Sequence, residues 1–117
     1  MRTAHGYGQL LVDDSGRTLY LFTGDPAVRS RCDGGCAKAW PPLIVSAKPG
    51  GGAGVQRSAL GITRRVDNTL QATYHGHPLY YFAGDSQPGQ INCQDVEEFG
   101  GHWWLIKPSG APNRATP

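Results

Sequence analysis

With 117 residues, the chain has room for one domain, or for two small halves that share one core. Its 11 basic and 9 acidic residues give a net charge of +2, and no run of Lys or Arg exceeds the pair Arg64-Arg65, so a nucleic-acid-binding protein is not indicated. No segment approaches the roughly 18 consecutive apolar residues of a membrane-spanning helix, so we expect no membrane span.

The N-terminal residues 1–7 contain no hydrophobic stretch and therefore do not read as a signal peptide. Two explanations stay open for this start. Either the native protein is cytoplasmic, or the chain is a mature exported form with an added start methionine.

Residues 16–25 are repeated at residues 76–85, where six of the ten positions are identical. Each copy carries the pattern Tyr-x-Phe-x-x-Asp; the motif residues are Tyr20, Phe22, Asp25, Tyr80, Phe82 and Asp85. Self-similarity of this kind indicates one supersecondary unit that is used twice. We therefore expect a single domain over residues 1–117, with a first repeat at about 8–46 and a second at about 60–108.

The first repeat begins with a predicted hairpin. Residues 10–12 and 18–22 are apolar and flank a turn at Ser15-Gly16, where glycine suits the positive φ of a tight loop. A two-residue loop would place Val12 opposite Leu19 and Leu10 opposite Leu21. One short helical turn at 36–40 follows, ended by two prolines, and then a third strand at 42–45.

The second repeat follows a flexible Gly-rich connector at 47–54 and an extra strand at 60–66. Its hairpin comprises residues 70–74 and 77–82 around His75-Gly76, which predicts that Ala72 faces Leu79 and Leu70 faces Tyr81. A third strand lies at 103–106, and the polar tail 109–117 is expected to be flexible. The predicted fold is all-β, with about seven strands in two β-meanders that are related by a pseudo-twofold and share one core.

The Tyr and Phe of each motif are two residues apart, so they point to the same face of a strand, and the Asp falls in the following loop. In a structural interpretation the aromatic rings fill the core and the carboxylate accepts backbone N–H bonds in the turn. In a functional interpretation Tyr and Asp form a hydrogen-bonded pair in a pocket. Because the motif occurs twice, we favour the structural interpretation.

Cys32 and Cys36 flank Gly34-Gly35, and Cys93 makes the number of cysteines odd. From the residues alone, the close pair can form a disulfide, supply two ligands to a soft metal, or remain as thiols; Cys93 can also pair with either of them. The candidate metal ligands beyond the cysteines are His75, His77 and His102. The acidic pair Glu97-Glu98 reads as solvated surface. No nucleophile or phosphate-binding motif is present, so we expect neither an enzyme nor a cofactor.

Over about residues 8–108 the chain resembles the bacterial predicted lipoproteins with a Yx(FWY)xxD motif, also described as a secreted repeat of unknown function. The resemblance rests on both Tyr-to-Asp motifs, on the run from Cys32 to Leu43 (C-x-x-x-C-A-x-x-W-P-P-L) and on the ending from Trp103 to Pro108. It implies export and a Cys32–Cys36 disulfide, with Cys93 left as a free thiol. The family brings no established activity.

These observations predict a small extracytoplasmic protein, located in the periplasm, at the cell surface or outside the cell. We expect it to act as a binding or structural module of the cell envelope, whose partner is an unidentified envelope protein or small ligand. The family is compatible with a lipid anchor on the native precursor. The alternative is a periplasmic metal-binding or redox protein that uses Cys and His ligands.

Overall fold

The computed structural model describes residues 2–4, 8–13, 15–25, 30, 32, 34–46, 55–65, 67–87, 89–92, 94 and 96–113. Within these ranges antiparallel strands dominate, which confirms the predicted all-β class. The helical segments are short: α1 (Gly34–Ala39), which precedes Pro41, and the single 3-10 turn η1 (Arg57–Ala59). Near the N-terminus, β1 (Arg2–Ala4) and β2 (Gly8–Leu10) form a two-stranded ladder.

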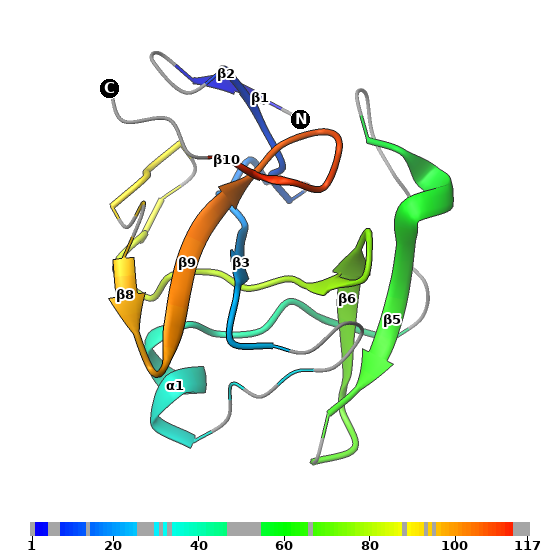
Figure 1. The fold of residues 1–117 in the computed structure, drawn as a ribbon, viewed down its shortest axis with the longest axis vertical. Helices are drawn as coiled ribbons and strands as arrows, with labels where there is room; N and C mark the ends of the chain where they lie inside the picture. Colours follow the sequence, from blue (N-terminus) through cyan, green and yellow to red (C-terminus); the bar gives the residue numbers. More distant parts are fainter. Residues whose placement is uncertain are drawn as a thin grey trace.

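The other strands form two four-stranded sheets (Figure 1). The first sheet has the order β10-β9-β3, with β8 also paired to β9; its strands are β3 (Tyr20–Phe22), β8 (Val96–Glu98), β9 (Gly101–Ile106) and β10 (Pro112–Asn113). The second sheet has the order β4-β6-β5, with β7 also paired to β6; its strands are β4 (Ile44–Val45), β5 (Leu60–Arg64), β6 (Leu70–Tyr74) and β7 (His77–Pro78).

The two repeats exchange their third strands. β9 of the second repeat pairs with β3 of the first, and β4 of the first repeat pairs with β6 of the second. The sequence predicts these third strands but not the exchange. Both faces of each hairpin are apolar, so each hairpin needs cover from elsewhere in the chain, and the other repeat supplies it.

The motif tyrosines pair directly with each other across the two repeats. Tyr20 and Tyr80 form an antiparallel bridge in which each backbone N–H donates to the other residue's carbonyl oxygen, at 2.8 and 3.0 Å. The two residues occupy equivalent positions in the repeats. A pseudo-twofold axis that relates the copies therefore passes between them.

The core consists of two apolar clusters, one on each face of β3 and β9. The aromatic cluster comprises Leu10, Tyr20, Phe22, Cys32, Cys36, Trp40, Tyr80, Trp103 and Leu105. The aliphatic cluster comprises Leu11, Leu19, Leu21, Leu60, Ala72, Tyr74, Leu79, Trp104 and Ile106. Residues that alternate along each strand thus enter opposite clusters, as the two-residue period of a strand requires.

The register of the second hairpin is as predicted near its turn. Tyr74 pairs with His77, and the Leu79 N–H donates to the Ala72 carbonyl at 3.0 Å. His75 and Gly76 both have positive φ, at 49° and 79°, as a two-residue loop of this kind requires. Further from the turn the prediction fails, because β4 takes the place beside β6 and Leu70 pairs with Val45 instead of Tyr81.

The predicted register of the first hairpin is wrong by one residue, since Val12 pairs with Thr18 rather than with Leu19. The cause is Asp13, whose carboxylate accepts the N–H groups of Ser15 and Arg17, each at 2.9 Å, and so stabilises a longer loop. The slip moves Leu10 into the aromatic cluster and Leu11 into the aliphatic one.

The C-terminal segment departs from the predicted flexible tail, because Pro112–Asn113 pair with β9 as β10. The turn before β10 is closed by a hydrogen bond from the Lys107 N–H to the Ala111 carbonyl at 3.0 Å, and Gly110 packs against the side chain of His75. This part of the tail is therefore bound to both sheets. Residues 114–117 and the predicted connector 47–54 lie outside the described residues.

Candidate functional site

The two Tyr-to-Asp motifs are bonded to each other across the repeats. The Tyr20 hydroxyl donates to Asp85 Oδ2 and the Tyr80 hydroxyl donates to Asp25 Oδ2, each at 2.6 Å. Within each copy the aspartate N–H donates to the carbonyl of the motif phenylalanine. The Tyr–Asp pair of the functional interpretation therefore exists, but it connects the copies, and its tyrosines are buried core residues as the structural interpretation expects.

One carboxylate in these pairs is deeply buried. Asp85 is 2% exposed, and its Oδ1 atom accepts the Asn92 N–H at 2.9 Å while Oδ2 accepts Tyr20. Asp25 is half-buried. A backbone N–H thus bonds the carboxylate of Asp85, but it comes from Asn92, seven residues further along the chain, rather than from the turn that directly follows Gly84.

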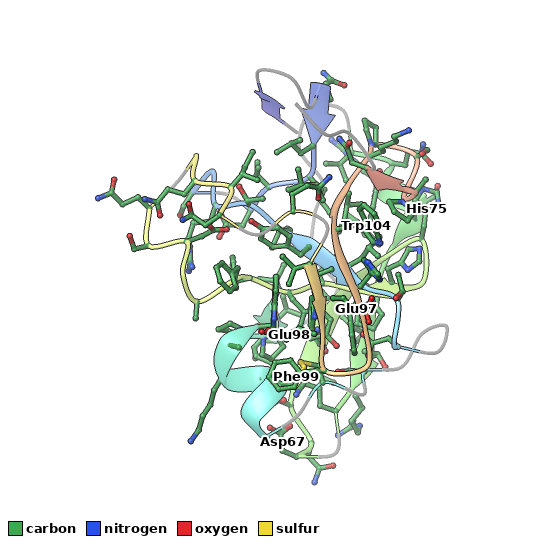
Figure 2. The ribbon with its side chains drawn as sticks, turned by 60° about the vertical axis from the view of Figure 1, so that its left-hand side comes forward. Asp67, His75, Glu97, Glu98, Phe99 and Trp104 are labelled. Carbon is green, nitrogen blue, oxygen red and sulfur yellow. A yellow bond between two sulfur atoms is a disulfide. The ribbon has the colours of Figure 1, made fainter. Side chains whose placement is uncertain are left out.

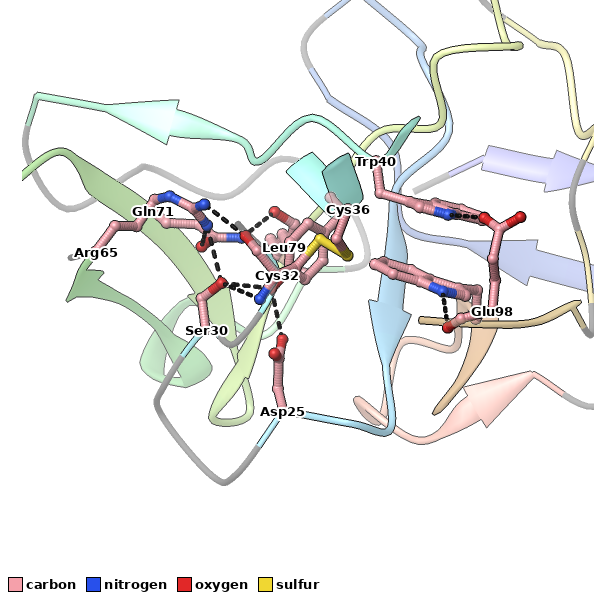
Figure 3. The surroundings of a disulfide bond; sticks show 11 residues. Asp25, Ser30, Cys32, Cys36, Trp40, Arg65, Gln71, Leu79 and Glu98 are labelled. Atoms are coloured by element: carbon pink, nitrogen blue, oxygen red, sulfur yellow. Dashed lines mark hydrogen bonds between the residues drawn. A yellow bond between two sulfur atoms is a disulfide. The ribbon is translucent and has the colours of Figure 1, made fainter. Parts of the chain in front are cut away.

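Tyr80 also belongs to a polar network inside the molecule, whose members Ser30, Arg65 and Gln71 are labelled in Figure 3. Its hydroxyl lies 2.7 Å from Ser30 Oγ, and that atom accepts a hydrogen bond from the guanidinium of Arg65 at 2.8 Å. Arg65 is only 7% exposed and donates further to the Gln71 side chain and the Cys32 carbonyl. Burial, reinforced by the bond to Asp25, raises the pKa of Tyr80 well above its ordinary value.

Sequence reasoning missed this network. From the sequence, Arg64-Arg65 is only a short basic run, whereas the side chain of Arg65 is buried in the structure. The signal that could have found it is Gln71, a long polar side chain that is fully buried in β6. Its side-chain amide donates to the Leu79 carbonyl at 2.7 Å while its oxygen accepts from Arg65.

The structure contains the disulfide between Cys32 and Cys36. Both cysteines are buried in the aromatic cluster, and α1, which contains Cys36, leads directly to Trp40. The backbone N–H of Trp40 donates to the Cys36 carbonyl at 2.8 Å. The predicted free thiol, Cys93, lies outside the described residues.

Four aromatic rings from the two repeats form a stack. The indoles of Trp40 and Trp103 lie face to face, with centroids 4.0 Å apart and planes 5° apart. Phe22 stacks against Trp103 with centroids 4.3 Å apart and planes 11° apart, whereas Phe82 lies against Trp40 at 4.7 Å with its ring tilted by 41°. Each phenylalanine therefore contacts the tryptophan of the other repeat.

Glu98, an exposed residue, accepts hydrogen bonds from both indoles. Its carboxylate accepts the Trp40 Nε1–H at 2.9 Å, and its backbone carbonyl accepts the Trp103 Nε1–H at 3.2 Å. The sequence predicts Glu97 and Glu98 as solvated surface. Both are exposed, but Glu98 also satisfies two indole donors.

The turn after Glu98 presents an exposed aromatic residue beside α1 (Figure 2). Phe99 is 50% exposed and has a φ of 56°, in the left-handed region that a bulky side chain rarely adopts. The residues that follow this turn are tightly held. A Cβ atom on Gly101 would lie 2.6 Å from the Gly24 nitrogen, and the His102 N–H donates to Thr23 Oγ1 at 2.8 Å.

The candidate histidines do not assemble into a metal site. His75 and His77 belong to the second-sheet hairpin, whereas His102 lies on β9, stacked on Trp104 with its Nδ1 atom 3.8 Å from the Glu97 carboxylate. Among the residues that the structure describes, no group of three His, Cys, Asp or Glu side chains is placed to hold a metal ion. Burial, with a smaller effect from His75, lowers the pKa of His77.

Comparison with known families agrees with this architecture. The family described as a secreted repeat of unknown function matches residues 3–44 and 61–107. Each match contains one Tyr-to-Asp motif; the second also contains all of β9, and the first ends at Ile44, the first residue of β4. The chain belongs to this family, and an extracytoplasmic location is consistent both with that membership and with the disulfide. No curated protein and no solved structure shows significant similarity. None of the described helices is long and apolar enough to cross a membrane.

Proposed function

We propose that the protein is a rigid binding module of the cell envelope, without catalytic activity of its own, and that it presents the tip of the β8–β9 hairpin to a partner protein. The observation that carries this proposal is Phe99, which combines exposure with an unfavourable backbone conformation. A left-handed φ costs a non-glycine residue of order 1 kcal/mol or more. Asparagine or glycine would fit this turn with less strain, so a large aromatic residue there points to recognition.

The hairpin suits an anchoring role because the residues that flank its turn are held in place while Phe99 at the tip is exposed. The Glu98 carboxylate accepts a hydrogen bond from the Trp40 indole, and the backbone N–H of His102 on β9 donates to the side chain of Thr23 in the first motif. Binding energy at protein interfaces concentrates in a few rigid aromatic side chains. The adjacent carboxylate of Glu97 favours a partner with basic side chains around an apolar pocket.

The proposal can be tested by photo-crosslinking in cells that naturally make the protein. A photoreactive amino acid at position 99 should give one defined cross-linked product, whereas the same group at Ile62, an exposed residue on β5, should not. Equal labelling at both positions, or no product at position 99, would contradict the proposal. Cell fractionation of the same sample then identifies the compartment.

The variant Phe99→Asn separates recognition from folding. Asparagine tolerates positive φ, so we expect the melting temperature to stay the same or rise, while the cross-linked partner identified above no longer co-purifies. Phe99→Tyr keeps the ring and should retain the partner. A marked loss of stability in Phe99→Asn would instead assign Phe99 a packing role.

A further inference from the structure

The aromatic stack and the two Tyr–Asp pairs form one continuous assembly. Tyr20 meets Trp40 edge-on with a centroid distance of 5.3 Å, and Tyr80 meets Trp103 in the same way at 5.1 Å. The two indoles are in turn stacked on each other. Each tyrosine thus contacts the tryptophan of its own repeat and hydrogen-bonds to the aspartate of the other.

This arrangement fits the requirements of one-electron oxidation. A phenol that loses an electron must also lose its proton, and a carboxylate that already accepts the hydroxyl at 2.6 Å can take that proton without any rearrangement. An indole that loses an electron becomes a cation, which is stabilised by the face of a second ring and, at Trp40, by the carboxylate of Glu98. Burial of both indoles excludes water from the oxidised rings.

We propose that this assembly is a one-electron relay, through which the protein accepts oxidising equivalents from a one-electron oxidant at its surface and holds them on Tyr20 and Tyr80. The oxidant removes one electron from Trp40, and Tyr20 then gives one electron to the Trp40 cation and its hydroxyl proton to Asp85. The products are a neutral tyrosyl radical, a protonated Asp85, an unchanged Trp40 and an oxidant reduced by one electron. A one-electron reductant reverses the sequence, and the proton returns to Tyr20. Tyr80, Trp103 and Asp25 form a second branch, which differs in that Ser30 Oγ also lies 2.7 Å from the Tyr80 hydroxyl and that the Trp103 Nε1–H donates to the Glu98 backbone carbonyl.

Two other tyrosines serve as internal controls. The Tyr74 hydroxyl donates to the Pro108 carbonyl, which is not a base. The Tyr81 hydroxyl donates to the Asp13 carboxylate at 2.7 Å, but the Arg17 guanidinium lies 4.4 Å above its ring, where a positive charge opposes the loss of an electron. Both residues pack with the aliphatic cluster rather than with the stack.

The relay can be tested on the full-length, disulfide-bonded protein by flash photolysis, with a ruthenium polypyridyl complex and a sacrificial electron acceptor as the oxidant. Transient absorption should show a tryptophanyl radical that decays at the rate at which a tyrosyl radical appears. In the Tyr20→Phe/Tyr80→Phe double variant the tyrosyl signal should fall to background while the tryptophanyl signal persists. Tyr74→Phe/Tyr81→Phe, the matched control, should retain the full tyrosyl yield.

Several outcomes would overturn the proposal: no tyrosyl radical, a tyrosyl radical that forms without a preceding tryptophanyl radical, or loss of the tyrosyl signal in the control double variant. Trp40→Phe/Trp103→Phe should slow tyrosyl formation, whereas Trp104→Phe, on the other face of β9, should not. Circular dichroism verifies that each variant is folded. The kinetics of the unmodified protein test the order of events even if a variant fails to fold.

Discussion

At the scale of single residues, Tyr20 and Tyr80 connect the repeats through both their backbone and their side chains. Their backbones pair with each other, and each hydroxyl bonds the aspartate that follows the other tyrosine. Removing one hydroxyl would leave a buried carboxylate such as Asp85 without one of its donors, which costs about 1–3 kcal/mol or more for a charged group. The tyrosine and the aspartate of each motif therefore both serve to connect that repeat to the other one.

His77 should make the fold less stable in mild acid. Its pKa in the fold is lowered from 6.5, mainly by burial, so as the pH falls through 6.5 the unfolded chain binds a proton that the folded chain does not. Stability is then lost until the pH lies below the folded pKa. Urea unfolding at about pH 8 and about pH 5 should show a smaller loss in His77→Gln than in the unmodified protein. His102→Gln is the matched control, and equal losses in all three proteins would contradict the assignment.

The residue identities of the core were predictable, whereas their partners were not. Periodicity placed Tyr20 and Phe22 on one face of a strand and correctly indicated that both faces are buried. It could not show that Asp85 bonds Tyr20, because nothing local to either residue specifies a contact 65 positions away. The network around Arg65 was missed for the same reason.

At the scale of elements, the residues in each loop determined whether the strand register of the hairpin was predicted correctly. The His75-Gly76 loop has the two-residue geometry that the sequence suggests, and the register beside it is correct. In the first hairpin the capping carboxylate of Asp13 lengthens the loop, and one residue of slip moves two leucines between clusters. These capping bonds are local, between residues two and four positions apart, but a pattern of apolar residues does not report them.

The disulfide should stabilise the segment around α1 more than the whole fold. Cys32 and Cys36 close a very short loop, so the entropic gain should be below the roughly 3 kcal/mol expected for a 15-residue loop. Reduction with a phosphine should lower the melting temperature modestly and speed hydrogen exchange in α1 and at Trp40 first. Uniform acceleration of exchange across both sheets would refute a local role. Peptide mapping of the non-reduced protein provides the control, since a peptide containing Cys93 linked to either cysteine would disprove the pairing.

At the scale of the whole molecule, the exchanged strands make the two repeats interdependent. The β3–β9 and β4–β6 ladders each join one repeat to the other, and the stacked indoles come from different repeats. Neither repeat can unfold without exposing the core of its neighbour. Long-range pairing of this kind predicts a single cooperative unit.

Unfolding in denaturant should therefore be one transition, with coincident tryptophan fluorescence and far-ultraviolet circular dichroism curves. Tyr20→Ala, which removes a fully buried ring, should cost about 3–5 kcal/mol and shift both curves equally. Tyr20→Phe, which keeps the ring, should cost less. Two separate transitions, or a second repeat that stays folded in Tyr20→Ala, would show that the repeats are independent.

The exchange of strands between the repeats also suggests how the protein evolved. Two identical single-repeat chains could associate about a true twofold axis, as homodimers commonly do. In such a dimer each chain would cover the apolar faces of the other, form the Tyr–Asp hydrogen bonds with it and pair its third strand with it. Duplication and fusion of the gene would then convert that dimer into one chain, after which the halves could diverge. The Cys32–Cys36 bridge, formed entirely within the first half, is a sign of such divergence. On this view an ancestor with one repeat was an obligate dimer.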